Sequence, residues 1–126
     1  QERTKQILAL CGDSMLVYSG DDETAVDLML NGASGAISVT ANVTPKQCAE
    51  ICRLAISGDG IAAHKLNEKL MPLHLDLFLE SNPIPVKWAL AEMGKIGHGI
   101  RLPMTQLSDE HHERVRRAMR HADVIS

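Results

Sequence analysis

Two short apolar runs, separated by segments with helical patterns, limit the folds open to this chain more than any other feature. The runs are Met15–Tyr18 and Ala36–Val39, each with the length of a strand buried in a sheet. Helical patterns occupy residues 3–11, 21–30 and 44–57. This alternation predicts a parallel sheet of an α/β protein. A (β/α)8 barrel takes about 250 residues, so the 126 residues here predict part of such a sheet.

Strand signals disappear after residue 58, and the second half of the chain reads as helical. A helix is expected from Asp59 past Pro72, where it could kink. Another is expected from Pro85 to Met93, and a last one begins after Ser108. Residues 1–58 are therefore expected to form βα units, and residues 59–126 a helical domain.

Charge and cysteine usage exclude several classes of function. The net charge is −3 with both signs mixed, and we find no basic stripe of the kind that binds nucleic acid. The uncharged stretches are broken by Gly, Asn and Pro, so we expect no membrane span and no signal peptide. Three cysteines at no disulfide spacing favour the cytoplasm. Cys48 and Cys52 lack a second ligand pair, so we expect no metal.

Position alone draws attention to the residues that follow each apolar run. Gly20 follows the first run, at the end of a strand where a TIM barrel places its active site. A glycine lets a substrate approach the backbone, although it could simply form a tight turn. Asp21 and Asp22 are expected to cap the next helix. Ile37 would ordinarily be a core residue.

Three motifs together resemble a known family. They are Ser19-Gly20-Asp21-Asp22, Gly35-Ala36-Ile37-Ser38-Val39 and Asn82-Pro83-Ile84-Pro85-Val86-Lys87-Trp88. Over nearly the whole chain the sequence resembles the carboxyl-terminal part of dihydrodipicolinate (4-hydroxy-tetrahydrodipicolinate) synthases, class I Schiff-base lyases. The resemblance implies the last two strands of a TIM (β/α)8 barrel followed by an all-helical appendage.

The resemblance also implies a chemistry and a set of site residues. The family condenses pyruvate with aspartate semialdehyde through a lysine Schiff base, in lysine and diaminopimelate biosynthesis, without a metal or organic cofactor. Gly20 and Ile37 match residues that line the pyruvate pocket, with Ile37 acting through its backbone. Asn82 matches a residue at the site entrance. The family commonly forms homotetramers built from two dimers, so a homo-oligomer is expected.

No residue of this chain matches the family's nucleophile. A Schiff-base lysine lies at a strand end, where partial desolvation lowers its pKa. None of the chain's lysines falls in a predicted strand, and Lys87 falls in a predicted helix outside the barrel part. We therefore expect no catalytic residue here, with the lysine in an amino-terminal half of the barrel that precedes Gln1. The chain alone is expected to be inactive.

Two alternatives remain open at this point. The chain could be a non-catalytic half-barrel or interaction chain, although its unprotected apolar strands argue against a free-standing unit. It could also be part of a related pyruvate-dependent aldolase such as N-acetylneuraminate lyase. The Pro-Ile-Pro-Val-Lys-Trp stretch favours the synthase.

Overall fold

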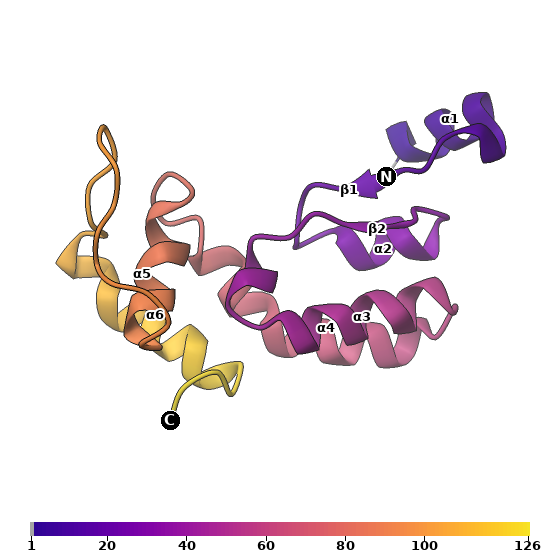
Figure 1. Cartoon of the computed structure of the whole chain (residues 1–126). Coiled ribbons are helices and arrows are strands. Elements are labelled where there is room, and N and C mark those ends of the chain that lie inside the picture. Colours follow the sequence, from indigo (N-terminus) through magenta and orange to yellow (C-terminus); the bar gives the residue numbers. More distant parts are fainter. Residues whose placement is uncertain (1) are drawn as a thin grey trace.

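The computed structural model describes residues 2–126. Most of the chain is helical, and two short strands lie in its first part (Figure 1). Two 3₁₀ turns, η1 and η2, complete the first part. In chain order the elements are α1 (Glu2–Cys11), η1 (Gly12–Ser14), β1 (Tyr18–Ser19), α2 (Ala25–Leu30), β2 (Gly35–Ala36), η2 (Thr40–Asn42), α3 (Pro45–Ile56), α4 (Gly60–Asp76), α5 (Ile84–Glu92) and α6 (Asp109–His121).

The two strands pair in parallel, as the alternation of strands and helices predicts. Tyr18 lies opposite Gly35, and Ser19 lies opposite Ala36. The strands are shorter than the predicted runs 15–18 and 36–39, and the first begins three residues later. Met15 and Leu16 are exposed by 55% and 68%, which contradicts the expected burial on both faces. Among the described residues no third strand pairs with these two, so no strand extends this sheet.

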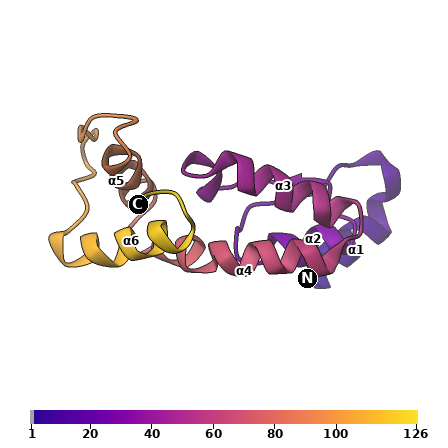
Figure 2. The same cartoon turned by 90° about the horizontal axis from the view of Figure 1, so that it is seen from below.

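Helices α2, α3 and α4 lie on one side of the strands and pack against one another (Figure 1). Seen from below, α3 and α4 run alongside each other, with α1 at one end of the molecule and α5 and α6 at the other (Figure 2). The core is aliphatic, as the scarcity of aromatic residues requires. Its largest fully buried apolar side chains are Leu70, Leu73, Leu77, Met119, Val26 and Val115.

Helix α4 joins the two ends of the molecule. It runs unbroken through Pro72, where a kink was possible. The Asp59 carboxylate accepts a hydrogen bond from the Ala62 amide at 3.1 Å and so caps its start. At its far end, Asp76 pairs with Arg114 of α6 at 2.8 Å. Because α4 packs on both α3 and α6, the division between residues 58 and 59 stays a prediction.

The predicted helix boundaries agree with the structure within one or two residues after position 44. Gly58 and Gly94 end α3 and α5 with positive φ angles of 85° and 68°, which glycine adopts without strain. Thr44 and Ser108 hold the N-cap positions of α3 and α6, but neither side chain caps its helix. The Ser108 amide instead donates to the Glu80 carboxylate at 3.1 Å. No helix of the described part is long and apolar enough to cross a membrane.

Candidate functional site

The carboxyl ends of the two strands bring Gly20 and Ile37 to the same edge of the sheet. Each follows its strand directly, and the Ile37 amide donates to the Ser19 carbonyl at 2.7 Å. Ile37 is 71% exposed, so it is not the core residue that its side chain alone would suggest. A Cβ built on Gly20 would meet no atom of the described chain within 4 Å. Both residues are therefore exposed at this edge, and the amide of Ile37 is already used by the bond to Ser19.

A local hydrogen-bond system shapes the turn after β1. The Ser19 hydroxyl lies 3.0 Å from the Asp21 carbonyl and 3.2 Å from the Asp21 amide, which spans Gly20. The Asp21 carboxylate accepts from the Thr24 amide at 3.1 Å and from the Thr24 hydroxyl at 2.6 Å. Asp21 thus closes the turn that leads into α2 but does not cap this helix, whose N-cap position is held by Thr24 without a side-chain hydrogen bond, so the predicted capping role of Asp21 is wrong.

Asp22 does not cap α2, and the prediction for this residue is wrong. Its Oδ2 accepts hydrogen bonds from the amides of Val39, at 2.9 Å, and of Thr40, at 3.1 Å. Asp22 is only 7% exposed. Its carboxylate therefore connects the turn after β1 to the segment after β2.

A chain of buried polar side chains continues from this connection into α4. The Thr40 hydroxyl lies 2.8 Å from Nδ1 of His74, and His74 Nε2 lies 3.1 Å from the Asn67 Oδ1. An imidazole that donates from Nε2 to the amide oxygen and accepts at Nδ1 from the hydroxyl satisfies all three groups. Burial lowers the pKa of His74, opposed by the nearby charges of Asp22, Asp21 and Glu23, and favours this neutral form.

The two cysteines of α3 border the same region but show no sign of reactivity. Burial raises the pKa of the Cys48 thiol to about 11 and also raises that of Cys52. A thiol that stays protonated at neutral pH is a poor nucleophile. The cavity between Cys48, Cys52 and His74 has a volume of about 20 Å³, enough for one water. Within residues 2–126 no cluster of three His, Cys, Asp or Glu side chains could hold a metal.

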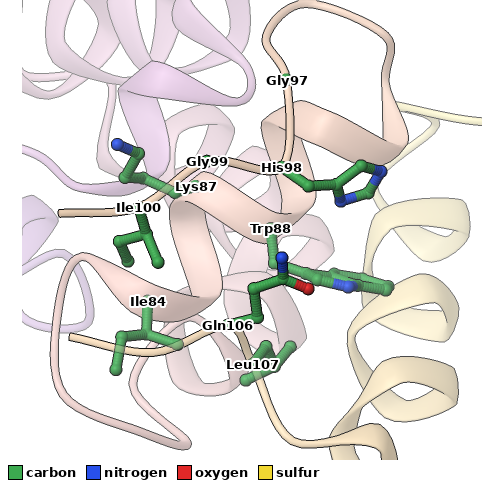
Figure 3. Close-up of a pocket in the computed structure, with 9 residues that line it drawn as sticks. All are labelled: Ile84, Lys87, Trp88, Gly97, His98, Gly99, Ile100, Gln106 and Leu107. Carbon is green, nitrogen blue, oxygen red and sulfur yellow. The ribbon is translucent and has the colours of Figure 1, made fainter. Parts of the chain in front are cut away.

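The segment 82–88 packs into the helical end of the molecule. Val86 and Trp88 are 4% and 7% exposed, so both side chains are buried. The Trp88 ring stacks on His112 with centroids 4.5 Å apart, and the Arg116 guanidinium lies 5.1 Å from its centroid. Figure 3 shows the pocket beside Trp88, roofed by the loop around Gly97. Its volume of about 10 Å³ is too small for an organic substrate, so we assign this pocket to packing.

Comparison with known proteins identifies the fold to which these strand ends belong. The sequence matches the Dihydrodipicolinate synthetase family over residues 1–122. The chain belongs to this family. It is 56% identical to the 4-hydroxy-tetrahydrodipicolinate synthase of Pseudomonas aeruginosa over 125 residues, covering 99% of this chain and 43% of that protein. The synthase of Acidithiobacillus ferrooxidans is also 56% identical, over 124 residues that cover 98% of this chain and 43% of the relative.

Solved synthase structures contain the same arrangement of elements. Dihydrodipicolinate synthase from Acinetobacter baumannii, crystallised with pyruvate, superposes with a TM-score of 0.96 at 53% identity, covering 98% of this chain and 43% of that chain. The enzyme from Aquifex aeolicus gives 0.93 at 36% identity, covering 98% and 42%. The described helices and parallel strands are therefore part of a synthase TIM barrel, and the chain spans less than half of the length of these relatives.

The remaining residues singled out from the family resemblance are placed as follows. Asn82 is exposed in the loop before α5, and its side chain has no hydrogen-bond partner among the described residues. Its predicted place at the synthase entrance stays a prediction. Lys87 lies in α5, pointing away from Trp88 (Figure 3). None of the lysines in residues 2–126 lies on β1 or β2, as the sequence predicts.

Sequence reasoning missed the buried polar residues Asp22, Thr40, Asn67 and His74. Their partners are distant in sequence: 18 residues separate Asp22 from Thr40, and 34 separate Thr40 from His74. One signal was available. Asn67 and His74 lie two helical turns apart on the same face as the fully buried Leu70, and polar side chains on such a face require partners.

Proposed function

We propose that this chain is the carboxyl-terminal part of a 4-hydroxy-tetrahydrodipicolinate synthase and forms one wall of its pyruvate site. In this proposal Gly20 and Ile37 supply open backbone to the pocket, and Asn82 lies at its entrance. The nucleophilic lysine belongs to a segment that precedes Gln1. The complete enzyme joins pyruvate to aspartate semialdehyde in lysine and diaminopimelate biosynthesis.

One observation carries the proposal. Two exposed backbone segments meet at the carboxyl ends of adjacent parallel strands, linked by the 2.7 Å hydrogen bond between Ile37 and Ser19. In TIM barrels this edge holds the active site. The A. baumannii synthase, which matches this chain with a TM-score of 0.96, is a complex with pyruvate. Backbone N–H groups that are free at such an edge can donate to the carboxylate and keto oxygens of a small keto acid, whereas the Ile37 amide is already bonded to Ser19.

The chemistry assigns different roles to this chain and to the amino-terminal segment that carries the lysine. The lysine amine adds to the keto carbon of pyruvate and expels water, which leaves an imine. Loss of a proton from the methyl carbon of this imine gives an enamine, and that carbon then forms the new bond to the aldehyde carbon of aspartate semialdehyde, whose oxygen takes up a proton. This chain contributes orientation to these steps, because a substrate held in a reactive geometry reacts far faster than a free one.

The complete protein is expected to work in the cytoplasm as a homo-oligomer. Cys11, Cys48 and Cys52 are all free thiols, which is compatible with a reducing compartment. The family resemblance supplies the expectation of an oligomer, and mass measurement of the complete protein under native conditions would test it.

A chimera tests the proposed function. The chain would be fused in register to the amino-terminal remainder of the P. aeruginosa synthase, which is 56% identical over the shared part. We expect the chimera to condense the two substrates and to form one borohydride-trapped pyruvate adduct per chain, on a lysine of the P. aeruginosa part. The isolated chain should form none. An adduct on Lys87, or an inactive, well-folded chimera, would refute the proposal.

A further inference from the structure

The sheet itself holds the two strand ends only weakly. β1 and β2 pair over two residues each, and beyond them the Ile37–Ser19 bond is the last backbone hydrogen bond between the strands' carboxyl ends among the described residues. Gly20 and Ile37 are both exposed. Something other than strand pairing must fix the distance between them if they are to bind one small molecule together.

The Asp22 carboxylate provides that link. It lies two residues after Gly20, and its Oδ2 accepts from the Val39 and Thr40 amides, at 2.9 and 3.1 Å, two and three residues after Ile37. Bonds from amides to a carboxylate are about twice as strong as those between neutral groups. The residue is 7% exposed, so water competes poorly for these bonds.

Further contacts anchor this link to α4. Thr40, one of the two residues held by Asp22, is fully buried, and its hydroxyl lies 2.8 Å from His74 Nδ1. His74 is fixed in turn by Asn67 at 3.1 Å. Both lie on α4, a helix of 17 residues. The segment after β2 is therefore held from two sides, by Asp22 and by α4.

We infer that Asp22 is a positioning residue for pyruvate binding, which sets the spacing between the backbone of Gly20 and that of Ile37. The inference rests on the proposed function. It assigns Asp22 no direct contact with substrate, because its Oδ2 is occupied by two amides and the side chain is buried. Capping of α2 does not explain the residue, since Asp21 closes that turn through Thr24.

The test compares three substitutions in the active chimera. Asp22→Ala removes both bonds and should raise the pyruvate KM about tenfold or more, with a smaller effect on the KM for aspartate semialdehyde. Asp22→Asn keeps an oxygen of the same shape without its charge, and should raise the pyruvate KM about threefold. Asp59→Ala is the matched control: it removes another carboxylate that accepts from a backbone amide, at 3.1 Å, and should lower the Tm without changing the pyruvate KM.

Each outcome decides something. A pyruvate KM within twofold of the parent in Asp22→Ala, with a lowered Tm, would reduce Asp22 to a structural residue and overturn the inference. If Asp22→Ala does not fold, Asp22→Asn decides alone. A threefold rise in its pyruvate KM at unchanged Tm supports the inference, and an unchanged pyruvate KM overturns it. An inactive parent chimera would instead refute the proposed function, and the inference would fall with it.

Discussion

Apolar side chains are exposed around the two strands, which we call the strand edge, and buried among α4, α5 and α6, which we call the helical end. Around the strands, Leu16 and Ile37 are 68% and 71% exposed. At the helical end, Leu70 and Val115 are fully buried, and Trp88 is 7% exposed between His112 and Arg116. The helical end has its packing partners within the chain. The strand edge resembles a core with one side uncovered, as expected for part of a TIM barrel.

This difference has a direct consequence for the isolated chain. Exposed strand edges and apolar faces promote association, so the chain alone should sediment as a mixture of associated species. The complete chimera should sediment as one defined oligomer, because the added barrel strands cover β1 and β2. Sedimentation velocity over a range of concentrations makes this comparison. A monodisperse monomer of the chain alone, with cooperative calorimetric unfolding, would contradict it.

Paired leucine truncations measure the same difference as free energies. Leu70→Ala removes a fully buried side chain and should cost about 2–5 kcal/mol of unfolding free energy in both the chain and the chimera. Leu16→Ala should change the isolated chain by less than about 0.5 kcal/mol. In the chimera, where barrel strands should cover Leu16, it should cost about 2 kcal/mol or more.

Urea unfolding at low protein concentration gives these values. Each leucine serves as the control for the other. If Leu16→Ala destabilised the isolated chain as much as Leu70→Ala, the strand edge would already be packed, and the contrast between the two ends would be wrong.

Gly20→Val separates substrate binding from folding at the strand edge. An added Cβ meets no atom of this chain within 4 Å apart from its two chain neighbours. If the barrel strands of the chimera leave the proposed pocket open beside Gly20, the Tm should change by only about 2 °C. A branched side chain where pyruvate approaches should lower kcat/KM about 100-fold, or about 2.7 kcal/mol. The matched control is Gly97→Val, at a loop glycine with equally open surroundings, which should leave kcat/KM unchanged.

Activity that persists in Gly20→Val while the Tm falls by several degrees would make Gly20 a turn residue only. Equal losses of activity in Gly20→Val and Gly97→Val would point to a general effect of valine in loops. In either case the assignment of Gly20 to the pyruvate site would be wrong.

The two regions also differ in how well the sequence predicts them. Helix ends were predictable because their signals are local: Gly58 and Gly94 adopt positive φ angles directly after the helices that they end. The strand bounds were not, because strand length depends on neighbours, and Met15 and Leu16 have none among the described residues. Local signals therefore predicted the helix ends better than the strand ends.

The candidate site was predictable only in part, for a related reason. Gly20 and Ile37 could be selected by family resemblance, and parallel pairing brings them together. The role of Asp22 depends on amides 17 and 18 residues away, and no local pattern distinguishes it from Asp21, which closes the turn before α2. Buried polar connections of this kind follow from tertiary contacts, which a single sequence does not reveal.

The buried connection to α4 should finally give the stability a small, defined pH dependence. His74 is 4% exposed, and burial lowers its pKa below the ordinary value of 6.5. Between the folded pKa and 6.5 the unfolded chain therefore binds the additional proton, so the free energy of unfolding rises with pH in that window and levels off above it. Asp22, Asp21 and Glu23 face the imidazole and oppose the shift.

Unfolding of the chimera by urea between pH 5 and 8 should show this window, with a slope of at most about 1.4 kcal/mol per pH unit from one group. Staying above pH 5 keeps the titration of the carboxylates out of the measurement. His74→Gln should flatten the profile, whereas the control His98→Gln, in an exposed loop, should leave it unchanged. An unaltered slope in His74→Gln would mean that His74 is not the group whose protonation weakens the link between the strand edge and α4.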